Sequence, residues 1–111
     1  MIHVLRVGVV TVLKPRAAMI GEGLSACKRH LQDQLQNLKS RLIFDFSEVP
    51  LIQSEGLEFL VEAQQACLQQ GGSVAICAPN ELCKEVLSIC GLQHSIGIFP
   101  DLRSALSEFA R

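Results

Sequence analysis

The sequence contains no tryptophan and no tyrosine, and five phenylalanines supply all of its large aromatic side chains. Positive charge is not in excess either, because eleven aspartates and glutamates outnumber ten lysines and arginines, for a formal net charge of −1. Proteins that bind nucleic acids use a positively charged surface, and those that bind single strands add aromatic rings on which bases stack. The composition therefore argues against a nucleic-acid partner.

Long apolar runs are also absent, although 49% of the residues are hydrophobic. The uninterrupted apolar stretches reach only a few residues, whereas a membrane-spanning helix needs about 20. The first sixteen residues are interrupted by Arg6 and lack the small-residue cleavage site of a secretory signal. We therefore expect a cytoplasmic protein without direct membrane insertion, folded as one domain over residues 1–111.

Cysteine motifs for metals or redox chemistry are missing as well. The chain has five cysteines, an odd number, and no C-x-x-C spacing. They are Cys27, Cys67, Cys77, Cys83 and Cys90. Most stand at apolar positions of helix or strand patterns, so we interpret them as small core residues in a reducing compartment, with zinc binding or a reactive thiol as the alternatives.

Motifs for catalysis are also lacking. The sequence has no glycine-rich phosphate loop, no G-x-S-x-G nucleophile elbow and no H-E-x-x-H zinc motif. Its three histidines are scattered without metal-ligand spacing. We therefore expect no enzyme, no catalytic or metal-binding residue and no cofactor.

What the sequence does contain is a regular succession of strand and helix patterns. β-Branched residues alternate with polar ones near the N-terminus and predict a hairpin or one long bent strand that ends at Lys14 and Pro15. Further strands are predicted at residues 41–46, 73–77 and 96–99, the first two nearly continuously apolar. Amphipathic helices are predicted over residues 21–37, 54–70, 80–90 and 101–109.

The resulting order, ββαβαβαβα, is typical of a single α/β domain. It predicts a mixed, mostly parallel sheet of about five strands joined by right-handed crossovers, with four helices. The order leaves room for all of the helices on one side of the sheet.

Helical spacing also predicts which side chains face the core. In the second helix these are Leu57, Leu60, Val61 and Leu68, with Ala63, Ala66 and Cys67 widening the stripe. In the third helix they are Leu82, Val86, Leu87 and Ile89. Asn80 and Asp101 are predicted N-caps, and glycines at 71–72 and 91 are predicted to end the second and third helices.

Functional loops of such sheets lie beyond the carboxyl ends of the strands. The junction from Ser47 to Ser54 is longer than the two to six residues usual for such loops. Ser54 is the predicted N-cap of the second helix, and Glu55 and Glu58 would place favourable negative charge in its first turn. With Glu62 they form an acidic stripe, which indicates a solvated face or a docking surface.

Residues 42–60, LIFDFSEVPLIQSEGLEFL, resemble the signature of the STAS domains, the sulfate transporter and anti-sigma factor antagonist family. In that family an apolar strand ends in Asp and leads through a hydrophobic loop to Asp-Ser-Ser-Gly-Leu at the start of a helix. The similarity continues in the Gly-Gly strand entry at 70–77, the third helix with its Gly-Leu ending at 80–92, and the final strand and helix at 98–106.

The resemblance implies a non-catalytic regulatory protein of the anti-sigma factor antagonist type. In such proteins the unmodified domain binds an anti-sigma factor that is also a serine kinase, which releases the sigma factor. Phosphorylation of the serine after the motif's Asp ends the association, and a phosphatase resets it. That serine corresponds to Ser54. The implied partner-binding residues are Gln53, Ser54, Glu55, Gly56, Glu58 and Glu62.

Three residues differ from the family's usual pattern. Gln53 replaces the usual Asp, Glu55 replaces a second Ser or Thr, and Glu58 replaces a small residue. A constant contact needs no phosphotransfer, so Gln53 and Glu55 favour an alternative, an accessory subunit of a phospholipid ABC-type membrane transporter that docks through the same loop and helix. Small-molecule binding at the loops of the sheet and homodimer formation also stay open.

Overall fold

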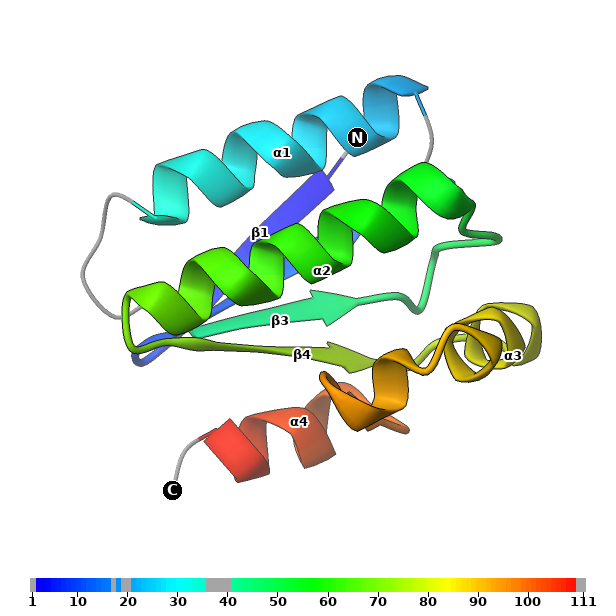
Figure 1. Cartoon of the computed structure of the whole chain (residues 1–111). Coiled ribbons are helices and arrows are strands. Elements are labelled where there is room, and N and C mark those ends of the chain that lie inside the picture. Colours follow the sequence, from blue (N-terminus) through cyan, green and yellow to red (C-terminus); the bar gives the residue numbers. More distant parts are fainter. Residues whose placement is uncertain (1, 17, 19–20, 36–40, 110–111) are drawn as a thin grey trace.

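Five strands form one mixed sheet in the computed structural model of the chain (Figure 1), which describes residues 2–16, 18, 21–35 and 41–109. In sheet order they are β1 (Ile2–Val7), β2 (Val10–Pro15), β3 (Arg41–Asp45), β4 (Ser73–Cys77) and β5 (Gly97–Phe99). β1 and β2 are antiparallel, and each later neighbouring pair is parallel. The predicted sheet is confirmed.

Four α-helices connect or follow the strands, as predicted. They are α1 (Gly21–Leu35), α2 (Ser54–Gln69), α3 (Glu81–Ile89) and α4 (Leu102–Phe109), and a short 3₁₀ helix, η1 (Leu92–His94), follows α3. The predicted extension of the first helix to residue 37 lies outside the described residues. Among the described residues, no helix combines the length and apolar character that crossing a bilayer requires.

The first two strands form a hairpin at one edge of the sheet. Val7 lies opposite Val10 across a two-residue turn. Gly8 has a φ of 61°, the left-handed conformation that a type II′ turn requires at its first central residue. Of the two arrangements that the sequence allowed, the hairpin is therefore the one adopted.

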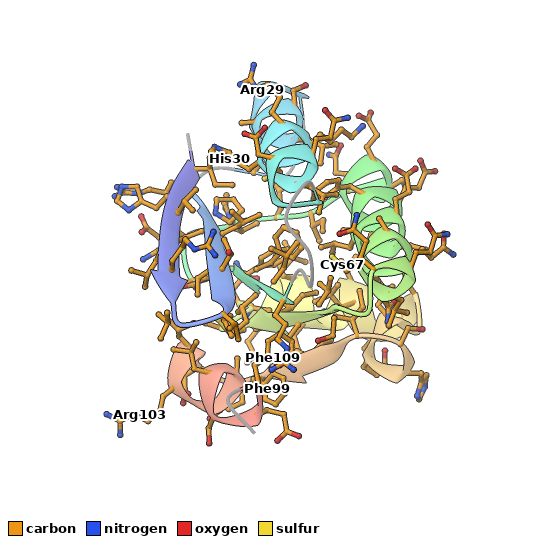
Figure 2. The ribbon with its side chains drawn as sticks, turned by 90° about the vertical axis from the view of Figure 1, so that its left-hand side faces the viewer. Arg29, His30, Cys67, Phe99, Arg103 and Phe109 are labelled. Atoms are coloured by element: carbon orange, nitrogen blue, oxygen red, sulfur yellow. The ribbon has the colours of Figure 1, made fainter. Side chains whose placement is uncertain are left out.

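Helices cover both faces of the sheet rather than one (Figure 1). Leu42 and Phe44 of β3 belong to the larger core under α1, α2 and α3, whereas Ile43 between them belongs to a second core under α4. Figure 2 shows Phe99 and Phe109 on the α4 side of the sheet. Because successive strand residues point to opposite faces, a continuously apolar strand needs cover on both.

The predicted inner face of α2 is partly wrong. Val61 and Leu68 are 36% and 56% exposed, while Phe59, which was not assigned to the core, is 1% exposed. The buried residues of α2 are Gly56, Phe59, Leu60, Ala63 and Cys67. Apolar residues stand on more than one face of this helix, so spacing alone does not select the buried face. The buried face is selected by the fit of the large Phe59 ring into the core.

The same correction applies to α3. Cys83 and Leu87 are buried, whereas the predicted core residues Leu82 and Ile89 are 53% and 79% exposed. Val86 lies between these groups and is half-buried. The helix therefore carries a buried stripe and, beside it, an exposed apolar stripe.

The predicted helix ends are largely confirmed. The Oδ1 of Asn80 accepts a hydrogen bond from the N–H of Cys83 at 2.7 Å, and the Oδ1 of Asp101 accepts one from the N–H of Ser104 at 2.7 Å. Gly71 and Gly91, with φ of 77° and 74°, supply the left-handed residues after α2 and α3. The exception is the start of α2, described below.

Candidate functional site

The loop from β3 to α2, residues 46–53, is anchored by apolar side chains. Phe46, Val49 and Ile52 are buried. The N–H of Phe46 donates to the carbonyl of Cys77 at 2.9 Å, and the N–H of Val49 donates to the carbonyl of Phe46 at 3.0 Å. This long loop is therefore packed against the carboxyl edge of the sheet, and it places Ser54 at a defined position there.

Asp45, the carboxylate that ends β3, turns the chain into this loop. Asp45 is only 7% exposed, and its Oδ1 accepts a hydrogen bond from the N–H of Ser47 at 2.9 Å. Burial, followed by the negative charges of Asp45 and Asp101, raises the pKa of the neighbouring Cys77 thiol to about 12. Through its hydrogen bond to Ser47, the carboxylate of Asp45 fixes the direction in which the chain leaves β3.

Asn80 connects the same loop to α3. While its Oδ1 caps α3, its Nδ2 donates to the carbonyls of Val49 and Pro50 at 3.3 and 3.1 Å. The thiol of Cys83 also donates to the carbonyl of Val49, at 3.7 Å. The start of α3 and the loop before Ser54 are therefore held together through one side chain and its neighbour.

An ion-pair network ties the loop to the hairpin. Glu48 pairs with Lys14 at 3.1 Å and with Arg16 at 3.3 Å, and Arg16 lies 3.2 Å from the Nε2 of His3. The hydrogen bond from Lys14 is the largest cause that lowers the pKa of Glu48 below its usual value of 4.5. Because the folded-state pKa is lowered, this network stabilises the fold above about pH 4.5 and is lost as the pH falls further.

Ser54 is the first residue of α2 and not its N-cap, which corrects the prediction. Gln53 occupies the N-cap position with extended backbone, φ −116° and ψ −179°, and its side chain makes no capping hydrogen bond. Glu55 lies in the first turn, whereas Glu58 lies beyond it. Ser54 is exposed, and its hydroxyl is not committed to capping the helix.

The predicted partner-binding residues divide into two groups. Gln53, Ser54, Glu55, Glu58 and Glu62 are exposed on the start and outer face of α2. Gly56 is buried on the opposite face and packs toward the core. Its burial makes it a residue that seats the helix, so the accessible part of the candidate surface consists of the other five.

Two adjoining hollows lie between α2 and α3 and share Leu57 in their walls. One, of about 520 Å³, is lined by Ile52, Gln53, Ser54, Glu55, Leu57 and Val86. The other, of about 350 Å³, is lined by Leu57, Glu58, Val61, Glu62, Cys90 and Leu92. Ser54 therefore lines a hollow with mixed walls, polar at Gln53 and Glu55 and apolar at Leu57 and Val86, and the adjoining hollow of the same groove is mainly apolar.

Sequence reasoning missed three parts of this site. It assigned Leu82 and Ile89 to the core, it treated Asn80 only as a cap, and it did not connect Glu48 to the hairpin. The spacing of Leu82, Val86 and Ile89 at i, i+4 and i+7 was a usable signal, because it is offset from the Cys83 and Leu87 stripe. The other two depend on contacts between distant segments.

Cys90 offers a native probe of the groove. Cys90 is exposed, whereas Cys27, Cys67, Cys77 and Cys83 are buried. Burial raises the pKa of Cys27 and of Cys67 to about 11, and the thiolate is the reactive form. At pH 8 a disulfide reagent such as Ellman's reagent is therefore expected to modify one thiol per chain rapidly and the others only in denaturant. Cys90→Ser is expected to abolish the rapid phase, and a rapid phase of two or more thiols would contradict this assignment.

Known proteins match the chain along most of its length. The STAS domain family model matches residues 2–105. A Thermotoga maritima protein named a "putative anti-sigma factor antagonist" is 28% identical over 103 residues, which cover 92% of this chain and 91% of that protein. A crystal structure from T. maritima with the same description has a TM-score of 0.90 at 25% identity and covers 99% of this chain and 95% of its own.

A third match is the phosphorylated form of the Bacillus cell fate determinant SpoIIAA. Its TM-score is 0.78 at 12% identity, over 98% of this chain and 99% of that one, which is a likeness of fold alone. The fold is therefore that of the anti-sigma factor antagonists. Because the family model spans nearly all of the described sheet and helices, the chain belongs to the STAS domain family.

Proposed function

We propose that the chain is a non-catalytic regulator of the anti-sigma factor antagonist type. It binds an anti-sigma factor with serine kinase activity, phosphorylation of Ser54 ends the association, and a phosphatase restores it. The observation that carries the proposal is the position of Ser54, which is exposed on the first residue of α2, at the end of an anchored loop, in a chain of the STAS family.

The surroundings of Ser54 suit a switch by charge. A phosphate adds about −1.5 to −2 charges, and the N-terminus of α2 would stabilise it through its free N–H groups and dipole. Glu55 and the apolar walls formed by Ile52, Leu57 and Val86 would oppose it. A partner whose apolar side chains fill this hollow would therefore lose contact when the phosphate is added. A loss of about 2–3 kcal/mol would weaken binding roughly 30- to 150-fold.

The position of Ser54 also makes the test clean. Since Ser54 does not cap α2, Ser54→Ala is expected to change the free energy of unfolding by no more than about 0.5 kcal/mol. Incubation of the protein with ATP and its cognate serine kinase is expected to add one phosphate, located at Ser54 by mass spectrometry. Ser54→Ala is expected to abolish it. Ser47→Ala, which removes an exposed serine of the same loop, is the matched control and is expected to leave it unchanged.

Binding of the same kinase by the three forms separates the proposal from its alternative. Wild type and Ser54→Ala are expected to bind, and Ser54→Asp is expected to bind at least roughly tenfold more weakly. Phosphate on another residue, or none with the cognate kinase, would contradict the switch. Equal binding of a transporter subunit by all three forms would instead support the constant contact of an accessory subunit.

A further inference from the structure

An exposed apolar surface crosses from α2 to α3. Leu82, Val86 and Ile89 follow one another at helical spacing along α3, and Ile89 is 79% exposed. Leu57 and Val61 lie on the facing side of α2. Contiguous apolar surface of this kind marks an interaction site more often than scattered single residues do.

The two hollows make this surface a groove rather than a flat patch. Leu57 lines both of them, Val86 lines the one next to Ser54, and Cys90 lines the other. The α2 wall extends from Ser54 to Glu62, a rise of about 12 Å, or roughly two helical turns. The groove therefore has the length to hold one face of a short helix, and Leu57, Val61 and Val86 supply apolar contacts along it.

Acidic residues form one rim along the α2 side of the groove and a second rim beyond it, on the outer side of α3, where they line a separate hollow with Ile89. Glu55, Glu58 and Glu62 stand along α2, and Glu81 and Glu85 stand along the outer side of α3. Among the described residues no lysine or arginine lines the two hollows of the groove, and Lys84, which lines the separate hollow on the outer side of α3, pairs through its Nζ with Glu81 at 3.5 Å. Five carboxylates against one lysine concentrate negative charge here, although the whole chain carries only −1.

We infer that the α2–α3 groove binds an amphipathic helix of the partner, with an apolar stripe flanked on both sides by lysine or arginine. The apolar stripe would cover Leu57, Val61, Val86 and Ile89, and the flanking cations would meet the carboxylates of the two rims. A second copy of this face would bring like charges together, and so would an anionic bilayer. The inference deepens the proposed function, since it rests on this face being the partner-binding surface.

Two synthetic peptides of about 15 residues test the inference with the full chain. They share one leucine stripe at i, i+3, i+4 and i+7 and differ only in the flanking residues, which are lysine in one and glutamate in the other. By fluorescence anisotropy the lysine peptide is expected to bind at least tenfold more tightly, and it is expected to slow modification of the Cys90 thiol about tenfold. Equal binding of both peptides, no binding of either, or binding without protection of Cys90 would overturn the inference.

Matched variants separate the groove from general surface effects. Ile89→Ser and Glu62→Lys are each expected to weaken binding of the lysine peptide severalfold. Leu5→Ser, at a 51% exposed residue on β1, and Asp33→Lys, at an exposed residue of α1, are the controls and are expected to change nothing. Equal losses in variants and controls, or protection of Cys90 by self-association without peptide, would also overturn it.

The outcome is independent of the phosphorylation test. The peptide-binding test uses no kinase, and Ser54 stays unmodified throughout. If the kinase phosphorylates Ser54 but the peptides fail to bind, the groove is rejected and the proposed switch stands. If the lysine peptide protects Cys90 but the cognate kinase leaves Ser54 unmodified, the groove stands and the switch is rejected.

Discussion

Phe59→Ala is expected to lower the free energy of unfolding by about 3–5 kcal/mol, the range for removing a large buried aromatic side chain. Phe59 is 1% exposed, and its ring packs edge to face against Phe44, with centroids 5.7 Å apart and planes at 77°. Domains of this size are stable by about 5–15 kcal/mol. The substitution therefore removes a large part of the total, and guanidinium unfolding measures it.

Leu68→Ala is the matched control on the same helix. Leu68 is 56% exposed, so its truncation is expected to cost no more than about 0.5 kcal/mol. The contrast tests the orientation of α2, because the helical pattern in the sequence placed Leu68 and not Phe59 in the core. Comparable losses for the two variants would mean that the helix is rotated from the position described.

A double-mutant cycle isolates the contact between the two rings. Phe44→Leu and Phe59→Leu keep each site apolar and remove the aromatic pair. The coupling energy is expected to be about 0.5–1.5 kcal/mol, the typical contribution of an edge-to-face pair beyond its buried area. A coupling near zero would show that the rings stabilise the fold only through burial.

Asn80→Ala, outside the hydrophobic core, is expected to lower the free energy of unfolding by about 2 kcal/mol, the second largest loss expected after Phe59→Ala. It removes the N-cap of α3, usually about 1 kcal/mol, and also the hydrogen bonds from Nδ2 to the carbonyls of Val49 and Pro50. Asn80→Ser keeps a capping oxygen but lacks the donor. It is therefore expected to recover about half of the loss. Urea unfolding of the two variants separates the contribution of the N-cap from that of the hydrogen bonds to the loop.

Hydrogen exchange distinguishes loss of the loop contact from loss of helix stability. The N–H of Val49, which donates to Phe46, is expected to exchange faster in both Asn80 variants. Asp101→Ala removes an N-cap from α4, on the other face of the sheet, and is the control that should leave Val49 unchanged. Equal exchange at Val49 in all the variants would show that Asn80 does not position the loop.

The position of Asn80 has a consequence for the proposed switch. The same side chain caps the helix that carries Val86 and Ile89 and holds the loop that precedes Ser54. The groove wall on α3 and the proposed phosphate acceptor on α2 are therefore aligned through one residue. Weaker partner binding by Asn80→Ser, with Ser54 still phosphorylated, is the result that this geometry leads us to expect.

Much of the fold is already specified by local chemistry in the sequence. Gly8, Gly71 and Gly91 each provide a left-handed residue where a turn or helix end needs one, and Asn80 and Asp101 provide capping oxygens. These signals act between residues close in the chain, so they are legible without the fold. The STAS signature around Ser54 is local in the same sense, and it indicated both the family and the segment at which we propose the site.

Tertiary packing decided the features that carry the proposals. Hydrophobicity marked Leu68, Leu82 and Ile89 as core residues, but each of the two helices has more apolar surface than the sheet can cover. Phe59 takes a buried position that was not predicted, and Leu87 takes one that was. Serine is a common N-cap residue, so Ser54 was predicted to cap α2. The helix begins at Ser54 itself, so the N-cap position falls to Gln53. The groove, its acidic rims and the Asn80 bridge arise only where α2, α3 and the β3–α2 loop meet, because contacts between distant segments depend on the whole fold.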